Sequence, residues 1–372
     1  MTDRPNSRRI ARVLARPLRL SAAGLLCLAL ALIVAHNTAR AFNTYADYFV
    51  RLSARPLAMG GAAGALCDPA SVFYNPAGLA GVRNLTLLYN HSARHFPGSQ
   101  EGGMREWDQL DGDTEAVVVP LMVGTYAHGF TFSGELGYDY RGHPADGRLG
   151  YPRERYWGTE DYDAFATSGG LPVAVGIGLR RSLGRFTPDP ADPRRLAWLR
   201  HGEGEQWGVL ARVWPGLDYG VSELKLNYDW TVFDNASGER GFPEFASKHI
   251  THREGWALYP TGWLTLTRDV VDENHIYDKQ LGTGVGQPVG LGPIHMGNQE
   301  RQTQHSGAEL CLGSLLKLRR GDYDGQPTVG VAFNLGGLWL NYAEAEGLLP
   351  LIVDGGSGFE DVHIYGAELN LW

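Results

Sequence analysis

The sequence has few cysteines, and after its first 35 residues it has no long apolar run. Three cysteines in 372 residues exclude a disulfide-rich scaffold. A membrane helix needs about 20 consecutive apolar residues, and the one stretch that approaches this length, Leu20 to Ala35, lies near the start. Any membrane span beyond it must be made of β-strands. Such strands must close into a barrel, because lipid offers no water to unpaired backbone groups.

Basic residues are scarce relative to acidic ones. The chain has 33 Lys and Arg against 41 Asp and Glu, and loss of residues 1–41 would leave 26 against 40, a net charge of −14. A nucleic-acid partner requires a basic surface, so we expect none. Glycine, by contrast, is abundant at 50 residues, and Trp and Tyr together number 27. This composition fits a chain of many strands and turns.

The N-terminal residues have the order of a secretory signal peptide. A positively charged region contains Arg4, Arg8, Arg9, Arg12, Arg16 and Arg19. The apolar stretch from Leu20 to Ala35 follows, and Ala39-Arg40-Ala41 then supplies a small-residue cleavage site. We predict that residues 1–41 are removed after Sec export and that Phe42 is the first mature residue. An uncleaved anchor is the alternative, but the stretch is shorter than a spanning helix needs.

From about Leu85 to the end, apolar and polar residues alternate with period two. The clearest apolar rows are Phe130, Phe132, Leu136, Tyr138 and Tyr140; Val173, Val175, Ile177 and Leu179; Leu224, Leu226, Tyr228 and Trp230; and Val329, Val331, Phe333 and Leu335. A soluble β-sandwich also alternates. Strands of about ten residues, aromatics near strand ends and the signal peptide favour a membrane barrel.

The alternating segments predict an all-β fold, a closed antiparallel transmembrane β-barrel over residues 83–372. Thirteen candidate strands can be counted, and because bacterial barrels have even strand numbers we predict about 14. One candidate strand covers residues 115–126 and another covers 306–318. Gly336-Gly337 and Ala127-His128 are predicted as periplasmic turns. The long polar insertions, including residues 184–205 and 270–305, are predicted as extracellular loops.

A segment that does not alternate lies between the signal peptide and the first strand. Arg55, Met59, Gly60, Gly61 and Asp68 are followed by the run Asn75-Pro76-Ala77-Gly78-Leu79. Pro76 biases Asn75 towards an extended conformation and Gly78 permits a tight turn, which predicts a fixed corner. Together these residues resemble the N-terminal segment of the FadL and PorV families of outer-membrane barrels.

In those families the segment is a hatch that plugs a fourteen-stranded barrel, so the resemblance implies a hatch at residues 42–82. Resemblance to FadL implies passive transport of hydrophobic small molecules such as fatty acids or hydrocarbons, without a cofactor. Resemblance to PorV, which the final hairpin Gly330 to Ala343 shares, implies instead an interaction with exported proteins of a type IX secretion system. In either case we expect a monomer in the lipid of the bacterial outer membrane.

Two further residue pairs have alternative interpretations. Cys67 lies in the predicted hatch and Cys311 on a predicted lumenal face, so an oxidising periplasm could join them in a disulfide. Two unpaired cysteines are the alternative. His249 and His252 could suggest a metal site, but residues three apart on a strand face opposite ways. We therefore predict no metal site.

A lipid-modifying barrel enzyme is the catalytic alternative. Ser92 with His91 and His95, or Ser306 with His305, would supply the residue types, but no G-x-S-x-G elbow is present. We therefore expect that the protein is not an enzyme. Charged side chains are predicted to face the lumen at Glu135, Asp139, Arg180, Arg212, Glu223, Lys225 and Asp229, and none is assigned a binding role.

Overall fold

The computed structural model describes eight stretches of the chain, all within the compact unit Ala41–Trp372. They are residues 53–96, 108–133, 155–167, 172–187, 196–234, 245–277, 299–346 and 361–371. The predicted cleavage-site residues Ala39, Ala41 and Phe42 lie outside the described residues. So do Glu135 and Asp139. In the part that is described, no helix has the length and apolar character that crossing a membrane requires.

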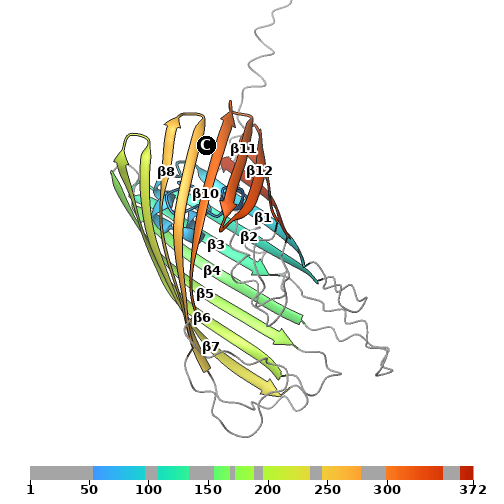
Figure 1. Cartoon of the computed structure of the whole chain (residues 1–372). Helices are drawn as coiled ribbons and strands as arrows, with labels where there is room; N and C mark the ends of the chain where they lie inside the picture. Colours follow the sequence, from blue (N-terminus) through green and yellow to red (C-terminus); the bar gives the residue numbers. More distant parts are fainter. Residues whose placement is uncertain are drawn as a thin grey trace, which may run out of the picture. The chain divides into compact units, whose positions relative to one another are not determined.

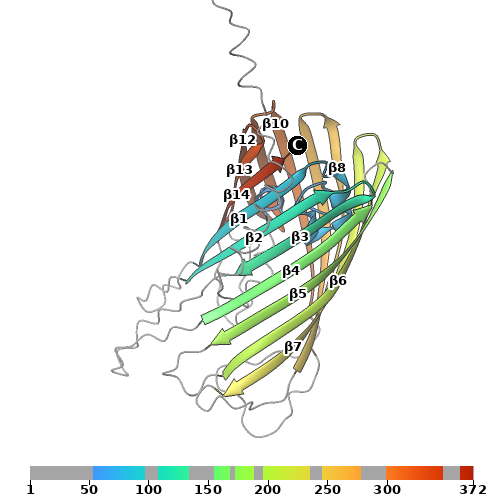
Figure 2. The same ribbon diagram turned by 180° about the vertical axis from the view of Figure 1, so that it is seen from behind.

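Fourteen antiparallel strands form a closed barrel in which each strand pairs with its neighbours in the sequence (Figures 1 and 2). The strands are β1 Leu85–Phe96, β2 Asp108–Pro120, β3 Gly124–Ser133, β4 Arg155–Thr167, β5 Val173–Thr187, β6 Leu196–Trp214, β7 Leu217–Asp234, β8 Phe245–Thr261, β9 Leu264–Tyr277, β10 Gln299–Leu312, β11 Leu316–Tyr323, β12 Gln326–Leu335, β13 Leu338–Ala345 and β14 Asp361–Leu371. The ring closes where β1 pairs with β14, with Leu85 opposite Leu371. The predicted fold class and strand number are confirmed.

The turns differ from the prediction at two places. The candidate strand 306–318 contains a turn between β10 and β11, so β11 is the strand that the count missed. Ala127 and His128 lie inside β3, and the turn between β2 and β3 is at Leu121–Val123 instead. Both turns carry apolar residues, which is why the pattern did not mark them. Gly336-Gly337 is a turn as predicted, with positive φ at both glycines.

The strands are also longer than predicted, because they continue into the polar insertions. β6 begins at Leu196 and β9 continues to Tyr277, within residues assigned above to loops. Apart from the Asp324-Gly325 turn between β11 and β12, the short turns between successive strands lie together at one end of the barrel, which we call the short-turn end (Figure 1). The other end, which we call the long-loop end, carries the longer connections.

The period-two pattern places alternate side chains inside and outside the barrel. On β5 the row from Val173 to Leu179 is exposed while Ala174 and Arg180 are buried inside, and on β12 Val329 and Phe333 are likewise exposed. These face assignments are confirmed.

The face assignment on β7 is wrong. Leu224, Leu226 and Tyr228 are buried in the lumen, and the guanidinium of Arg200 lies 4.4 Å from the ring centre of Tyr228. The polar row, Glu223, Lys225, Asn227 and Asp229, faces outward. Alternation reveals that two faces differ, but it does not tell which of them meets the lumen.

The remaining charged positions divide between lumen and rim. Arg180 is buried in the lumen as predicted, where it pairs with Glu160. Arg212 belongs to the inward row of β6 but lies near the short-turn end. Its side chain is 66% exposed, and it binds Asp218 at 3.1 Å. Of the predicted lumenal charges, Arg180 is therefore the one that lies deep inside among the described residues.

The N-terminal segment, residues 53–82, lies inside the barrel. It contains helix α3 (Ala54–Ala58), helix α4 (Ser71–Tyr74) and the 3-10 helix η2 (Pro76–Gly81). Helix α3 contacts β11 to β14, whereas η2 contacts β3 to β6 on the opposite side of the ring. Figures 1 and 2 show these helices enclosed by strands near the short-turn end.

Candidate functional site

Arg55 connects the N-terminal segment to the barrel wall. Its guanidinium donates to Glu309 of β10 over 2.8 and 3.1 Å, and to Asp68 of its own segment over 2.9 Å. Glu309 also accepts from Arg319 of β11 at 2.7 Å, and Arg319 donates to Asn341 of β13 at 2.9 Å. Burial would lower the pKa of Arg55, but the charges of Glu309 and Asp68 raise it well above its ordinary value. Arg55 therefore stays cationic in this network.

A second connection lies between the segment and β8 and β9. The buried carboxylate of Asp269 accepts hydrogen bonds from the backbone N–H groups of Ala63 (2.8 Å) and Gly64 (2.6 Å). The same oxygen accepts from Arg253 at 3.0 Å, and Arg253 also donates to the carbonyl of Gly61 at 2.7 Å. A charged wall pair thus satisfies backbone groups that would otherwise be unpaired inside the lumen.

The predicted residues Met59, Gly60 and Gly61 end helix α3 and turn the chain. Gly60 and Gly61 have φ values of +68° and +83°, a region that other residues rarely adopt. The N–H of Gly60 donates to Thr328 at 3.1 Å, and its carbonyl accepts from Nδ1 of His305 at 2.8 Å. Met59 is completely buried. The run therefore serves both chain reversal and attachment to the wall.

The predicted corner at Asn75 to Gly78 is present. Asn75 is extended, with φ −144°, its side-chain oxygen accepts from the N–H of Ala77 at 3.1 Å, and Pro76 opens η2. Gly78 has a different role from the one predicted, because its φ is not positive. A Cβ there would come closer than 3.0 Å to the carbonyl of Leu66, so close packing is what requires glycine.

Inward-facing glycines of the wall lie where the N-terminal segment touches it. At each, a Cβ would come closer than 3.0 Å to the segment. They are Gly129, Gly176, Gly208 and Gly220 on one side of the barrel and Gly307, Gly321 and Gly330 on the other. Gly208, for example, leaves room for the side chain of Asn75, which donates to the carbonyl of Val209 at 3.4 Å. The wall and the segment are therefore complementary in shape, as close-packed interiors require.

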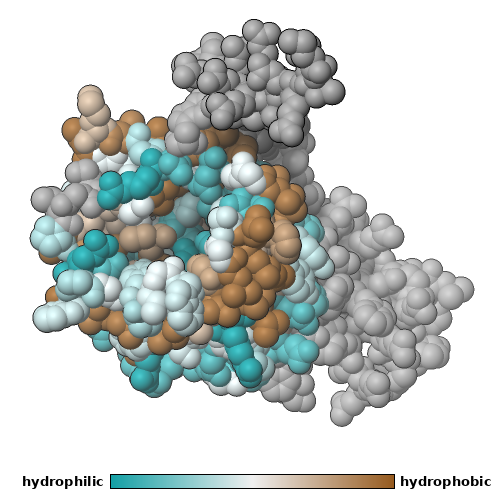
Figure 3. All heavy atoms as spheres, turned by 90° about the horizontal axis from the view of Figure 1, so that it is seen from above, coloured by the Kyte–Doolittle hydropathy of each residue, from teal (hydrophilic) through white to brown (hydrophobic). Residues whose placement is uncertain are grey.

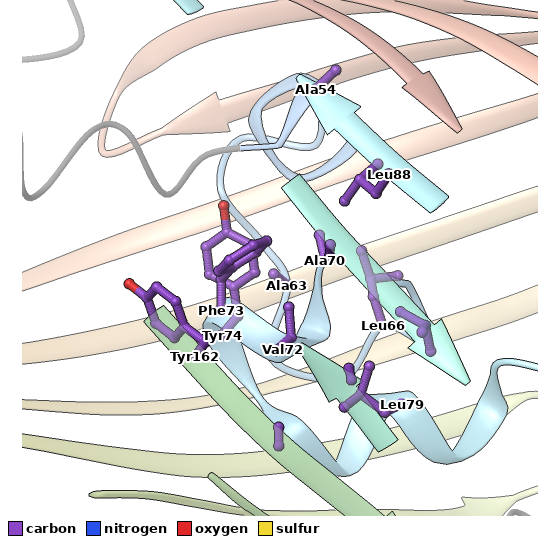
Figure 4. Packing of buried hydrophobic residues seen from close by; sticks show 14 of the residues in the cluster. Ala54, Ala63, Leu66, Ala70, Val72, Phe73, Tyr74, Leu79, Leu88 and Tyr162 are labelled. Carbon is purple, nitrogen blue, oxygen red and sulfur yellow. The ribbon is translucent and has the colours of Figure 1, made fainter. Parts of the chain in front are cut away.

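Phe73 and Tyr74 of helix α4 lie close to Tyr162 of β4 (Figure 4). Phe73 contacts Tyr162 of β4 edge to face, with ring centres 5.0 Å apart. Phe73 and Tyr74 border a cavity of about 60 Å³. Its other lining residues are Leu224, Val271, Tyr323, Gln206, Ser222, Thr251, Arg253, Glu273, Thr303 and His305. A water molecule needs roughly 10–15 Å³, so the cavity has room for a few waters.

Cys67 and Cys311 are both free, so the structure contains no disulfide between them. The side chain of Cys67 packs against Gly81 of its own segment. Burial, with the nearby charge of Asp218, raises the pKa of Cys67 to about 11. Cys311 shares the inward row of β10 with Glu309.

The structure does not bring the side chains of the adjacent histidine and serine residues together. His91 faces outward and contacts Asp113 at 3.0 Å, whereas Ser92 faces inward and donates to a backbone carbonyl. His305 is buried in the lumen and Ser306 is exposed outside. Adjacent strand residues point to opposite faces, so neither pair can act together.

His249 and His252 likewise point to opposite faces of their strand. His249 is 2% exposed and belongs to the inward row of β8, whereas His252 belongs to the outward row. Within the described stretches, no group of three or more His, Cys, Asp or Glu side chains could hold a metal ion.

The motif predicted Arg55, Asp68 and the Asn75 corner, but not their partners in the wall. Glu309 and Asp269 each share their strand with other acidic residues, and nothing in their local sequence distinguishes them. The sequence offered one signal for such partners: a charged residue in the inward row of a strand can bind a glycine-rich segment inside the barrel. Which inward charge meets Arg55 depends on strand register, which the sequence pattern does not reveal.

A closed fourteen-stranded barrel that encloses a short helical N-terminal segment has the fold of the FadL-type outer-membrane channels. The toluene transporter TodX of Pseudomonas putida aligns with a TM-score of 0.58 at 12% identity, over 86% of this chain and 98% of that one. The toluene transporter TbuX of Ralstonia pickettii aligns with a TM-score of 0.56 at 13% identity, over 87% and 100%. A Pseudomonas aeruginosa FadL homologue aligns with a TM-score of 0.52 at 12% identity, over 89% and 99%. No family profile and no characterised protein sequence matches the chain.

Proposed function

We propose that this protein is a passive channel of the bacterial outer membrane that admits small hydrophobic molecules, such as monoaromatic hydrocarbons or fatty acids. The observation that carries the proposal is a closed ring of strands, apolar on its outer face near the short-turn end, around a segment that presents aromatic side chains to the lumen. The shared fold with two toluene transporters supports the substrate class. We further propose that the protein is monomeric.

We propose that the N-terminal segment acts as a hatch. The cavity beside it has room for a few waters only, so a hydrocarbon can pass only if the segment moves. Phe73 and Leu224 would contact the apolar part of a substrate, while Arg253 could bind a polar group. The bonds made by Arg55 and Asp269 oppose this movement and therefore set its cost.

Uptake in a bacterial strain that lacks its own hydrophobic-compound channels tests the proposal. Cells that express the protein should accumulate radiolabelled toluene or a long-chain fatty acid faster than cells with an empty vector. Phe73→Asp should abolish the gain, because it places a charge beside the cavity, and Asn227→Asp, on the exposed outer face, should preserve it. Uptake equal to the empty vector for both compounds, or co-purification of an exported protein without apolar ligand, would contradict the proposal.

A further inference from the structure

Aromatic residues on the outer face of the barrel are hydrogen-bonded to carboxylates of neighbouring strands. The pairs are Tyr89 with Asp113 (2.8 Å), Tyr126 with Asp163 (2.6 Å), Trp207 with Glu223 (3.2 Å) and Tyr219 with Glu254 (2.8 Å). They recur between β1 and β2, β3 and β4, β6 and β7, and β7 and β8. We call them the girdle pairs. Such aromatics, with one apolar side and one polar end, are typical of the boundary between hydrocarbon and water.

On β6 and β7 the outer face changes character at the girdle pair Trp207–Glu223. Towards the short-turn end it is apolar, as in the row Val173 to Leu179, whose side chains are 44–62% exposed. Towards the long-loop end exposed polar residues follow, such as Glu203 on β6 and Asn227 on β7. On these two strands the hydrocarbon of a bilayer would therefore end near Trp207, on the side of the long loops.

The apolar rows alone are too short to span a bilayer. A strand from Val173 to Leu179 rises about 20 Å along its own axis, which is about 15 Å along the axis of a barrel whose strands tilt by about 35–45°. The apolar band of outer-membrane barrels is about 25 Å tall. The remaining height of the apolar band, about 10 Å, therefore has to come from residues beyond the strands, at the short-turn end.

Several turns at the short-turn end carry exposed apolar residues. Met122, at the tip of the turn between β2 and β3, is 100% exposed, and its neighbour Val123 is 74% exposed. Trp214, Trp263 and Leu315, in or beside three other turns, are 53–71% exposed. Figure 3, which looks onto this end, shows hydrophobic residues at several places around the rim, with hydrophilic residues between them. Periplasmic water would make such exposure unfavourable.

We propose that the short turns are embedded in the inner leaflet of the membrane, with Met122 and its counterparts against phospholipid chains and glycerol groups. This inference rests on the proposed membrane location. Two observations favour lipid over a protein partner. The apolar turns continue the lipid-facing rows of their own strands, and they are distributed over separate turns around the rim instead of forming one patch. Lipid is the occupant that surrounds a barrel on all sides.

Thiol labelling tests the embedding. In a chain whose Cys67 and Cys311 are replaced by Ser, single variants Met122→Cys, Ile177→Cys and Asn227→Cys report on the turn, the apolar band and the polar outer face. Each is reconstituted in nanodiscs of phosphatidylethanolamine and phosphatidylglycerol, which leave both membrane faces open, and treated with a charged maleimide. Labelling in urea provides the intrinsic rate of each thiol, and heat-modifiable gel mobility confirms folding.

We expect Met122→Cys and Ile177→Cys to label at least about tenfold more slowly than Asn227→Cys, because lipid excludes the charged reagent. If Ile177→Cys is slow and Met122→Cys is as fast as Asn227→Cys, the barrel spans the membrane but its turns reach water, which would overturn the inference alone. If all three label rapidly, the barrel is not embedded, and the proposed function fails with it. A purified protein in nanodiscs has no protein partner, so slow labelling at Met122→Cys identifies lipid.

Discussion

Replacing Glu309 by Gln should release the N-terminal segment from the wall without opening the barrel. Glu309 accepts hydrogen bonds from Arg55 and Arg319, and the three side chains are 2%, 18% and 2% exposed respectively. Removing one partner of a buried ion pair costs about 3–5 kcal/mol. We take the lower value, because Arg55 keeps its bond to Asp68. A loss of about 3 kcal/mol raises the population of the displaced segment roughly 100-fold, since about 1.4 kcal/mol is a factor of ten.

Hydrogen exchange measured by mass spectrometry provides the assay. Backbone amides of residues 54–82 should exchange about 100-fold faster in Glu309→Gln than in the native protein, while strand amides keep their protection. Glu254→Gln is the matched control, because its exposed carboxylate binds Tyr219 on the outer face and should contribute less than about 1 kcal/mol. Equal exchange of the segment in both variants would refute the reasoning. Loss of protection in all strands would show that the ion pair supports the barrel itself.

Three further substitutions or conditions test other parts of the structure. Gly208→Ala should lower the stability to urea by about 1–3 kcal/mol, because the new methyl group meets the segment. Gly262→Ala, in open space, should not, and equal midpoints would contradict the shape complementarity. Because burial raises the pKa of Cys67 to about 11, its alkylation should accelerate as the pH rises towards that value, and a pH-independent rate would argue against a protonated, buried thiol. Ile177→Lys should destabilise the protein in lipid by about 2–4 kcal/mol, whereas Asn227→Lys should have little effect; similar losses would remove the assigned bilayer boundary.

Much of the fold could be predicted because each face of a strand is constrained, the inner one by the N-terminal segment and the outer one by the proposed bilayer. On β5, the exposed Val173 and Ile177 would have to be apolar in the proposed membrane location, and Ala174 and Gly176 must be small to admit the N-terminal segment. The two requirements produce a clear alternation, and the predicted faces were correct there. The segment itself could be located because it does not alternate and carries the Met59-Gly60-Gly61 run, whose two glycines have positive φ in the structure.

The predictions failed where these constraints on the two faces of a strand do not apply, or where they do not distinguish one residue from another. β7 continues beyond the girdle pair Trp207–Glu223 towards the long-loop end, where Lys225 lies on the outer face and Leu226 packs inside. The polar row is therefore outside and the apolar row inside, which is the reverse of β5. β11 was missed because Leu315 in its preceding turn is as apolar as a strand residue. The partner of Arg55 could not be predicted, since strand register decides which inward carboxylate reaches it.

The seam between β1 and β14 has a consequence for assembly. Joining Leu85 to Leu371 brings together residues that are far apart in the chain, and such non-local contacts carry a loop-closure cost and form slowly. The N-terminal segment shortens this search, because it binds strands from both halves of the ring, β3 to β6 through η2 and β11 to β14 through α3. We therefore expect the segment that is proposed to obstruct the pore also to act as an internal template, holding the two halves in proximity while the last backbone hydrogen bonds form.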